Sequence, residues 1–353
     1  MTTTHEQLPE EVRAEIHEFA TKVQGAVSEV VVGMEDVVRQ FLIAMIVGGH
    51  VLLEGVPGTA KTTLAKALAG VLGIDHQRVQ FTPDLLPSDI TGTYVFDRSS
   101  NEFTLRKGPL FCQLLLADEV NRSPAKTQAA LLEAMQEHQV TIEGTTLPLP
   151  APFMVLATQN PVEQEGVYRL PEAQLDRFLM RVVMDYPTRE TEIDILKLHG
   201  GPKRIVVERE HESDDGEESH GSTVISGPPM PESVFSTDMI LSIQSRLGAV
   251  YTEPSLLPYI VDLVRETRRH PDIALGASPR AAIYLLQCAK AHALLDGRHY
   301  ATHADVHEVA PSVLGHRLIL RPEAEVEERS VSELLPELFE RVKIIPDNDA
   351  FPS

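Results

Sequence analysis

The stretch that most restricts the fold of this chain is residues 50–69. An apolar run at 51–53 leads into a turn rich in glycine and proline, and residues 61–69 are mostly good helix formers. A strand, a glycine-rich turn and a helix in this order predict a phosphate-binding loop, because the N–H groups and the dipole at a helix start favour an anion. An ordinary turn between a strand and a helix is the alternative, but it does not explain Lys61 and Thr62 at the helix start.

The residues of this turn have separate expected roles. Lys61 is expected to reach the β- and γ-phosphates of a nucleotide, and the Thr62 hydroxyl is expected to hold a Mg²⁺ ion. The turn departs from the general pattern at Ala60, which stands where glycine usually precedes the lysine. We expect a negative φ at this residue, since a methyl group is well tolerated there only in that conformation. The predicted phosphate-binding residues are Gly55, Val56, Pro57, Gly58, Thr59, Ala60, Lys61, Thr62 and Thr63.

Polar residues follow two further apolar runs, at 113–117 and 153–158. Such runs are typical of buried parallel strands, whose carboxyl ends face the ligand crevice in doubly wound sheets. After the first run, Asp118 is expected to bind the hydration shell of Mg²⁺, and Glu119 to orient and polarise an attacking water. After the second, Asn160 could bond the γ-phosphate or that water. Solvated or helix-capping acids and a plain Asn-Pro turn are the alternatives.

An arginine near residues 170–178 could stabilise charge that develops on the γ-phosphate of a neighbouring subunit. Arg177 is the first candidate, because it ends a short predicted helix just before a strand. A surface ion pair between Asp176 and Arg177 is the structural alternative, and it would contribute little. Arg122 and Arg169 are rival candidates for the same role.

The sequence from residue 233 is predicted to be helical, with helices starting at Ser236, at Ser255, at Ser278 and near residue 305. Arg280 lies one residue after a helix-starting proline, where the helix dipole disfavours a merely structural cation. We therefore expect a small helical domain that folds over the nucleotide and brings Arg280 to its phosphates.

Two other regions are candidates for ligand contact. Val32 and Gly33 lie in a short apolar loop between predicted helices at 8–28 and 36–47, and this loop could hold an adenine base or could simply connect the helices. A predicted hairpin inserted at 85–110 either contacts a substrate or partner or decorates the surface. A second, shorter hairpin is predicted at 139–150.

Charge and cysteine content restrict the class of protein. The 353-residue chain is long enough for two or three domains, and its net charge of −21 opposes general binding to nucleic acid. Its two cysteines have no partners at zinc-site spacing, which favours a reducing compartment. Without a signal-peptide pattern or an apolar run of about 18 residues, we expect a soluble cytoplasmic protein with no membrane insertion.

Composition also marks the expected domain limits. Residues 1–187 form the predicted nucleotide-binding domain, and residues 233–353 form the helical lid. Between them, residues 188–232 are expected to be a linker whose acidic part, with seven acids from 208 to 218, cannot bury enough apolar surface to become ordered. An acidic binding arm is the alternative for that segment.

Taken together, these motifs resemble those of MoxR-family AAA+ ATPases. The resemblance covers about residues 10–320, and Ala60 fits the family pattern. Arg169, where the family usually has proline, and a longer acidic segment at 203–231 depart from it. The matching segments are 55–63 (Walker A), 114–122 (Walker B), 158–161 (sensor 1), 170–178 (arginine finger) and 276–281 (sensor 2).

The resemblance implies an α/β fold, a P-loop AAA+ αβα sandwich with a parallel sheet, followed by the helical lid. It implies hydrolysis of ATP with Mg²⁺ in a homo-oligomeric ring, commonly a hexamer, with both inserted hairpins facing the central opening. It also implies protein clients, a partner with a von Willebrand A domain, and chaperone-like remodelling or maturation of protein complexes. A nucleic-acid motor is opposed by the net charge, and a nucleotide-gated scaffold with little turnover is opposed by the complete hydrolytic set.

Overall fold

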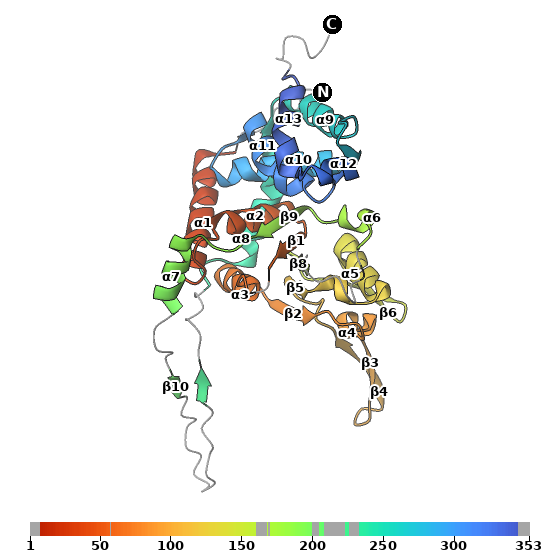
Figure 1. Cartoon of the computed structure of the whole chain (residues 1–353). Helices are drawn as coiled ribbons and strands as arrows, with labels where there is room; N and C mark the ends of the chain where they lie inside the picture. Colours follow the sequence, from red (N-terminus) through yellow and green to blue (C-terminus); the bar gives the residue numbers. More distant parts are fainter. Residues whose placement is uncertain are drawn as a thin grey trace, which may run out of the picture.

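A five-stranded parallel sheet forms the centre of the first half of the chain (Figure 1). The computed structural model describes residues 8–56, 58–159, 168, 170–199, 205–207, 223–225 and 233–344. The strand order is β2-β5-β8-β1-β9. Strand β8 therefore lies between β1, which leads into the glycine turn, and β5, which ends at Asp118. The strands are β1 (Val51–Gly55), β2 (His76–Gln80), β5 (Leu114–Asp118), β8 (Met154–Gln159) and β9 (Met180–Met184).

Helices cover both faces of this sheet, as the near-continuous apolar strands predict. Strand β1 alternates between two hydrophobic cores, because Val51 and Leu53 pack in one and Leu52 packs in the other. The first core includes α1 (Glu10–Ser28), α2 (Glu35–Val47) and α3 (Lys61–Leu72), and the second includes α5 (Ala125–Glu137). The predicted αβα architecture is confirmed.

Both predicted hairpins are present. Helix α4 (Pro87–Thr91) precedes the antiparallel pair β3 (Gly92–Asp97) and β4 (Glu102–Lys107), which projects from the body on the side away from α9 and α13 in Figure 1. The second hairpin pairs β6 (Gln139–Ile142) with β7 (Thr145–Pro148). The 3-10 turn η1 (Val120–Arg122) follows β5, and α6 (Glu172–Leu175) precedes β9.

The segment between the two halves contains α7 (Arg189–His199) and one pair of short strands. Strands β10 (Ile205–Val207) and β11 (Thr223–Ile225) are antiparallel. The sequence prediction, a linker at 188–232 with an acidic part that cannot become ordered, did not include this pairing, which lies on either side of the acids at 208–218. The remaining residues of that acidic segment lie outside the described part of the chain.

The C-terminal part is mainly helical, and the predicted starts at Ser236, Ser255 and Ser278 are confirmed. The last two helices lie within the stretch predicted to be helical, but the prediction gave them no starting residues, although Ser330 and Glu333 form a capping box that marks one of them. The helices are α8 (Thr237–Arg246), α9 (Leu256–Thr267), α10 (Pro279–Leu295), α11 (His303–Leu314), α12 (Pro322–Val326) and α13 (Val331–Arg341). Between them lie η2 (Leu247–Ala249) and the short pairs β12 (Tyr251–Thr252) with β14 (Tyr300–Ala301) and β13 (Ile273–Leu275) with β15 (Ile319–Leu320).

Candidate functional site

A pocket of about 370 Å³ lies at the carboxyl end of β1 and β5. It brings the predicted glycine turn together with both predicted acids, which follow that turn by about 60 residues in the sequence. Thr158, which the sequence prediction did not single out, completes the lining. The lining residues are Gly55, Val56, Gly58, Thr59, Ala60, Lys61, Thr62, Thr63, Asp118, Glu119 and Thr158.

The backbone of the turn is shaped by two residues with positive φ. Gly58 has a φ of 86° and Ala60 has a φ of 56°, and α3 begins directly afterwards at Lys61. The expectation of a negative φ at Ala60 is therefore wrong. The chain needs a left-handed residue at the N-cap of α3 to turn from the loop into the helix, and for alanine this conformation costs about 1–2 kcal/mol.

Close packing around Gly55 shapes the base of the turn. A Cβ atom at this position would lie 2.6 Å from the carbonyl oxygen of Met184 and 3.3 Å from Cε of Lys61, so only glycine fits. The Lys61 ammonium donates a hydrogen bond to the Gly55 carbonyl. Burial lowers the pKa of Lys61, while the negative charges of Asp118 and Glu119 act in the opposite direction.

Thr158 connects the two acids. The register of β5 and β8 pairs Ala117 with Ala157, so the next residues of the two strands lie side by side. The Thr158 hydroxyl donates to Oδ1 of Asp118 at 2.6 Å and accepts from the Glu119 N–H at 2.8 Å. One buried side chain therefore holds the carboxylate of Asp118 and the backbone of Glu119.

Strand β2 and the turn after β5 hold the opposite sides of these carboxylates. Arg78 donates to Oδ2 of Asp118 at 2.6 Å, and Gln80 donates to Oε2 of Glu119 at 2.6 Å. Arg122, a rival candidate for action on a neighbouring subunit, donates to Oε2 of Glu119 in its own chain at 2.9 Å. The donor set of carboxylate and threonine hydroxyl oxygens fits Mg²⁺, which prefers oxygen ligands.

Val32 and Gly33 do not line this pocket. They lie between α1 and α2, and Gly33 is held with a φ of 76° against the side chain of Thr191 in α7. An adenine-binding role for this loop stays a prediction. Pro57, Asn160 and Arg169 lie outside the described residues.

Arg177 and Arg280 meet in a different pocket, of about 340 Å³, at the amino end of β1. The expectation that the lid brings Arg280 to phosphates on its own P-loop is not met. Strand β1, about 16 Å long, separates this pocket from the glycine turn. The lining residues are Val47, Gly48, Gly49, His50, Met135, Gln136, Glu137, His138, Arg177, Arg280, Tyr284 and Gln287.

The predicted alternative of an Asp176–Arg177 ion pair is also wrong, because Asp176 pairs with Arg317 at 2.9 Å. Within the described residues, the side chains of Arg177 and Arg280 have no hydrogen bond or ion pair. Both arginines are half-buried and line one cavity. They are therefore available to a ligand that approaches from outside this chain.

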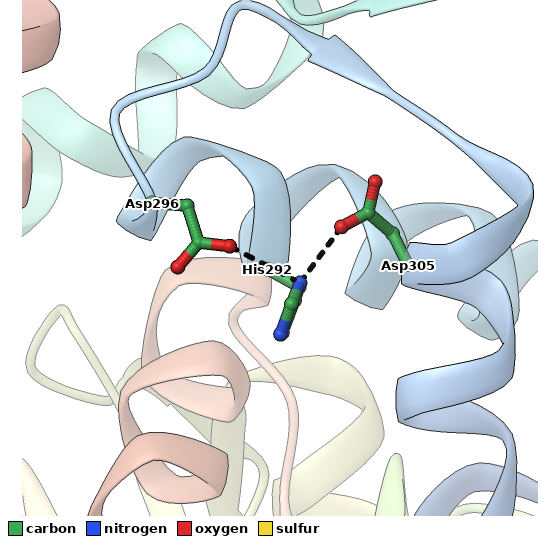
Figure 2. A group of neighbouring side chains, drawn as sticks. All are labelled: His292, Asp296 and Asp305. Carbon is green, nitrogen blue, oxygen red and sulfur yellow. Dashed lines mark hydrogen bonds and ion pairs between the residues drawn. The ribbon is translucent and has the colours of Figure 1, made fainter.

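His292 lies between Asp296 and Asp305 in a third group of polar side chains (Figure 2). Arg298 donates to both carboxylates, and Arg39 donates to Asp296 at 2.5 Å. Although burial opposes its ionisation, hydrogen bonds from Arg298 and His292 hold the pKa of Asp305 well below its usual range. Two arginines already neutralise these two acids, so we interpret the group as an ion-pair network that joins α2 to α10 and α11.

The comparisons with known proteins agree with this geometry. Residues 50–180 match the family described as ATPases associated with various cellular activities (AAA), and residues 265–338 match the AAA lid domain. The fold and the pocket thus define an ATPase of the AAA class. Among the helices in the described part of the chain, none combines the length and apolar character needed to cross a bilayer.

Relatives that match over nearly the whole chain define the family more closely. Chaperone MoxR1 of Mycobacterium tuberculosis is 39% identical, covering 99% of this chain and 88% of the relative. YeaC of Bacillus subtilis, an uncharacterised protein, is 42% identical over 94% of this chain and 96% of its own length. A crystal structure of a Cytophaga hutchinsonii protein assigned as an ATPase has a TM-score of 0.81 and 41% identity, covering 95% of this chain and 98% of that one. The chain belongs to the MoxR family of AAA+ ATPases.

Proposed function

We propose that this protein hydrolyses ATP with Mg²⁺ to remodel or mature protein complexes. The observation that carries the proposal is the single pocket that joins the glycine turn, Lys61, Asp118 and Glu119. The chaperone name of MoxR1 supports protein clients, and the family resemblance supports a partner with a von Willebrand A domain. The two free cysteines support a reducing compartment, and with it the cytoplasmic location. The proposed division into a nucleotide-binding domain, a linker and a lid has limits at residues 187 and 233.

In this proposal each residue of the pocket has one task. The amides of the turn and Lys61 bind the phosphates, and Thr62 and Asp118 would hold Mg²⁺, which neutralises phosphate charge when bound. Glu119 takes the proton of the attacking water. Gln80 and Arg122 hold its Oε2, while Oε1 has no partner within the described residues and is therefore the oxygen for that proton. Asn160 would position the same water, and Val32 and Gly33 would contact the adenine.

The proposed role of the two arginines requires a second subunit. Arg177 and Arg280 lie at the amino end of β1, whereas the glycine turn lies at its carboxyl end. We propose that both reach a nucleotide bound to the next subunit. The same contact repeated around an axis, with different surfaces on its two sides, gives a closed ring when the rotation between subunits closes. We expect a hexamer from the family resemblance.

Mixing two inactive variants tests this proposal. Lys61→Ala removes the phosphate contact and leaves Arg177 intact, and Arg177→Ala does the reverse. In rings assembled from equal amounts, about one quarter of the contacts pair an intact Lys61 with an intact Arg177, so ATP turnover should recover to about a quarter of the wild-type value. The proposal fails if wild-type protein does not hydrolyse ATP, and action across subunits fails if mixing restores nothing.

A further inference from the structure

We infer that a three-residue cluster between the lid and the core fixes the position of Arg177 relative to Arg280. The cluster consists of Asp176, Ser278 and Arg317. None of these residues lines the P-loop pocket, which contains Lys61, or the pocket lined by Arg177 and Arg280. The cluster would therefore act through the two arginines that it positions. The inference rests on the proposed role of both arginines on a neighbouring nucleotide.

Arg317, with a side chain only 2% exposed, uses all five of its N–H groups. Its Nε donates to Oδ1 of Asp176 at 2.9 Å, and Nη2 donates to the carbonyl of Asp176 at 3.1 Å and to that of Phe178. Nη1 donates to the carbonyls of Leu179, at 3.2 Å, and Val313. The guanidinium therefore binds the backbone on both sides of position 177.

Asp176 connects this buried cation to the start of α10. Its carboxylate accepts from the Ser278 hydroxyl at 3.0 and 3.1 Å, besides its bond from Arg317. Ser278 is the N-cap residue of α10, yet its side chain makes no capping bond within that helix. The hydroxyl is thus used to attach the helix start to Asp176, and Arg280 follows two residues later.

The consequence is that the two arginines move together. Within the described part of the chain, no hydrogen bond or ion pair holds the guanidinium of Arg177 or of Arg280, so their positions depend on the backbone beneath them. That backbone is fixed through Asp176, with Arg317 on one side and Ser278 on the other. Losing one bond of the cluster should displace the arginines from the neighbouring γ-phosphate without disturbing the P-loop pocket.

Ser278→Ala tests the inference with little risk to folding, because the serine does not cap its own helix. The matched control is Ser236→Ala, which changes the N-cap of α8, another helix with no side-chain capping bond. We expect Ser278→Ala to lower kcat for ATP about 10-fold while KM changes less than about 2-fold. The control should keep both values and the thermal midpoint of the wild type, while Ser278→Ala should have a somewhat lower midpoint, because it loses a hydrogen bond to a charged group.

Mixed rings separate positioning from a merely structural effect. When Ser278→Ala subunits are mixed equally with Lys61→Ala subunits, some of them gain neighbours with correctly placed arginines. The ATP turnover of the mixture should therefore be about fivefold higher than the summed turnover of the same amounts of the two variants assayed separately. Asp176→Asn, which weakens both bonds of the carboxylate, should lower kcat further and respond to mixing in the same way.

Three results would overturn the inference. If Ser278→Ala turns over ATP like the Ser236→Ala control while Arg177→Ala is inactive, the positioning role is wrong and the proposed function stands. If Ser278→Ala is slow but mixing restores nothing, its defect lies in its own pocket. If Arg177→Ala keeps wild-type turnover, the proposed role of the arginine fails, and the positioning role fails with it.

Discussion

Replacing Thr158 by valine tests how the two acids of the pocket are held. Thr158 is 1% exposed, and valine keeps nearly the shape of threonine while removing the hydroxyl. The change therefore removes the bond to the Asp118 carboxylate and the bond from the Glu119 N–H, with little change in packing.

The size of the effect follows from these two bonds. A hydrogen bond to a charged group contributes about 1.5–3 kcal/mol, and a buried N–H left without an acceptor costs about 1–3 kcal/mol. Arg78 still holds the other oxygen of Asp118 at 2.6 Å. The lost bond to the Asp118 carboxylate should therefore cost an energy near the lower end of the range for a charged group. We expect Thr158→Val to lower the free energy of unfolding by about 3 kcal/mol. We also expect kcat to fall about 100-fold, because the Asp118 carboxylate and the Glu119 backbone both lose the hydroxyl that holds them.

Urea denaturation measures the first quantity, and steady-state ATP hydrolysis at saturating ATP measures the second. Thr158→Ser is the control, because serine keeps the hydroxyl and removes only a methyl group. A valine variant as stable and as active as the serine variant would refute the reasoning. The acids would then be held by Arg78 and Gln80 of strand β2 and by Arg122, without Thr158.

Two other predictions concern Glu119 and the buried histidines. Glu119→Gln should bind ATP with nearly wild-type affinity and lower kcat by about 10²–10⁴-fold, and equal turnover in a single-turnover assay would exclude Glu119 as the base. Unfolding experiments between pH 7.5 and 4 should show stability falling below about pH 6.5, since burial lowers the pKa of His50 to about 4 and also lowers that of His316, so the unfolded chain binds more protons. His50→Gln should reduce this loss by up to about 3 kcal/mol, and an unchanged pH profile would contradict it.

Local sequence signals predicted most elements of the fold and all but one, Thr158, of the residues that line the pocket at the glycine turn. Lys61 was predictable because it begins a helix directly after a glycine-rich turn, and Asp118 and Glu119 because they stand at the end of an apolar strand. Parallel strands end at one edge of the sheet, which brings these residues together. Thr158 was harder to identify, since its role depends on the register between β5 and β8. The conformation of Ala60 could not be predicted from its type, because the turn imposes a φ that alanine rarely adopts.

Local sequence signals could not predict the location of Arg280 for a different reason. The sequence correctly predicts that α10 starts at Ser278, because serine followed by proline is a helix-start pattern. It does not tell at which end of the sheet that helix start lies. The structure decides this through the contact of Ser278 with Asp176, which is 102 residues away in sequence. Local patterns contain no information on a pairing of that range.

The separation of the two pockets by β1 has a consequence for regulation. In the proposed ring, a subunit whose lid shifts relative to the sheet would keep its own P-loop pocket but change the arginines that it presents to its neighbour. Arg39 and Asp296, which join α2 to the end of α10, would resist such a shift. If a client or partner protein moves the lid of one subunit, the shift would alter ATP hydrolysis in the adjacent subunit before hydrolysis in the same subunit. Successive lid shifts would then pass around the ring in one direction. That direction is set by the unlike surfaces of each contact.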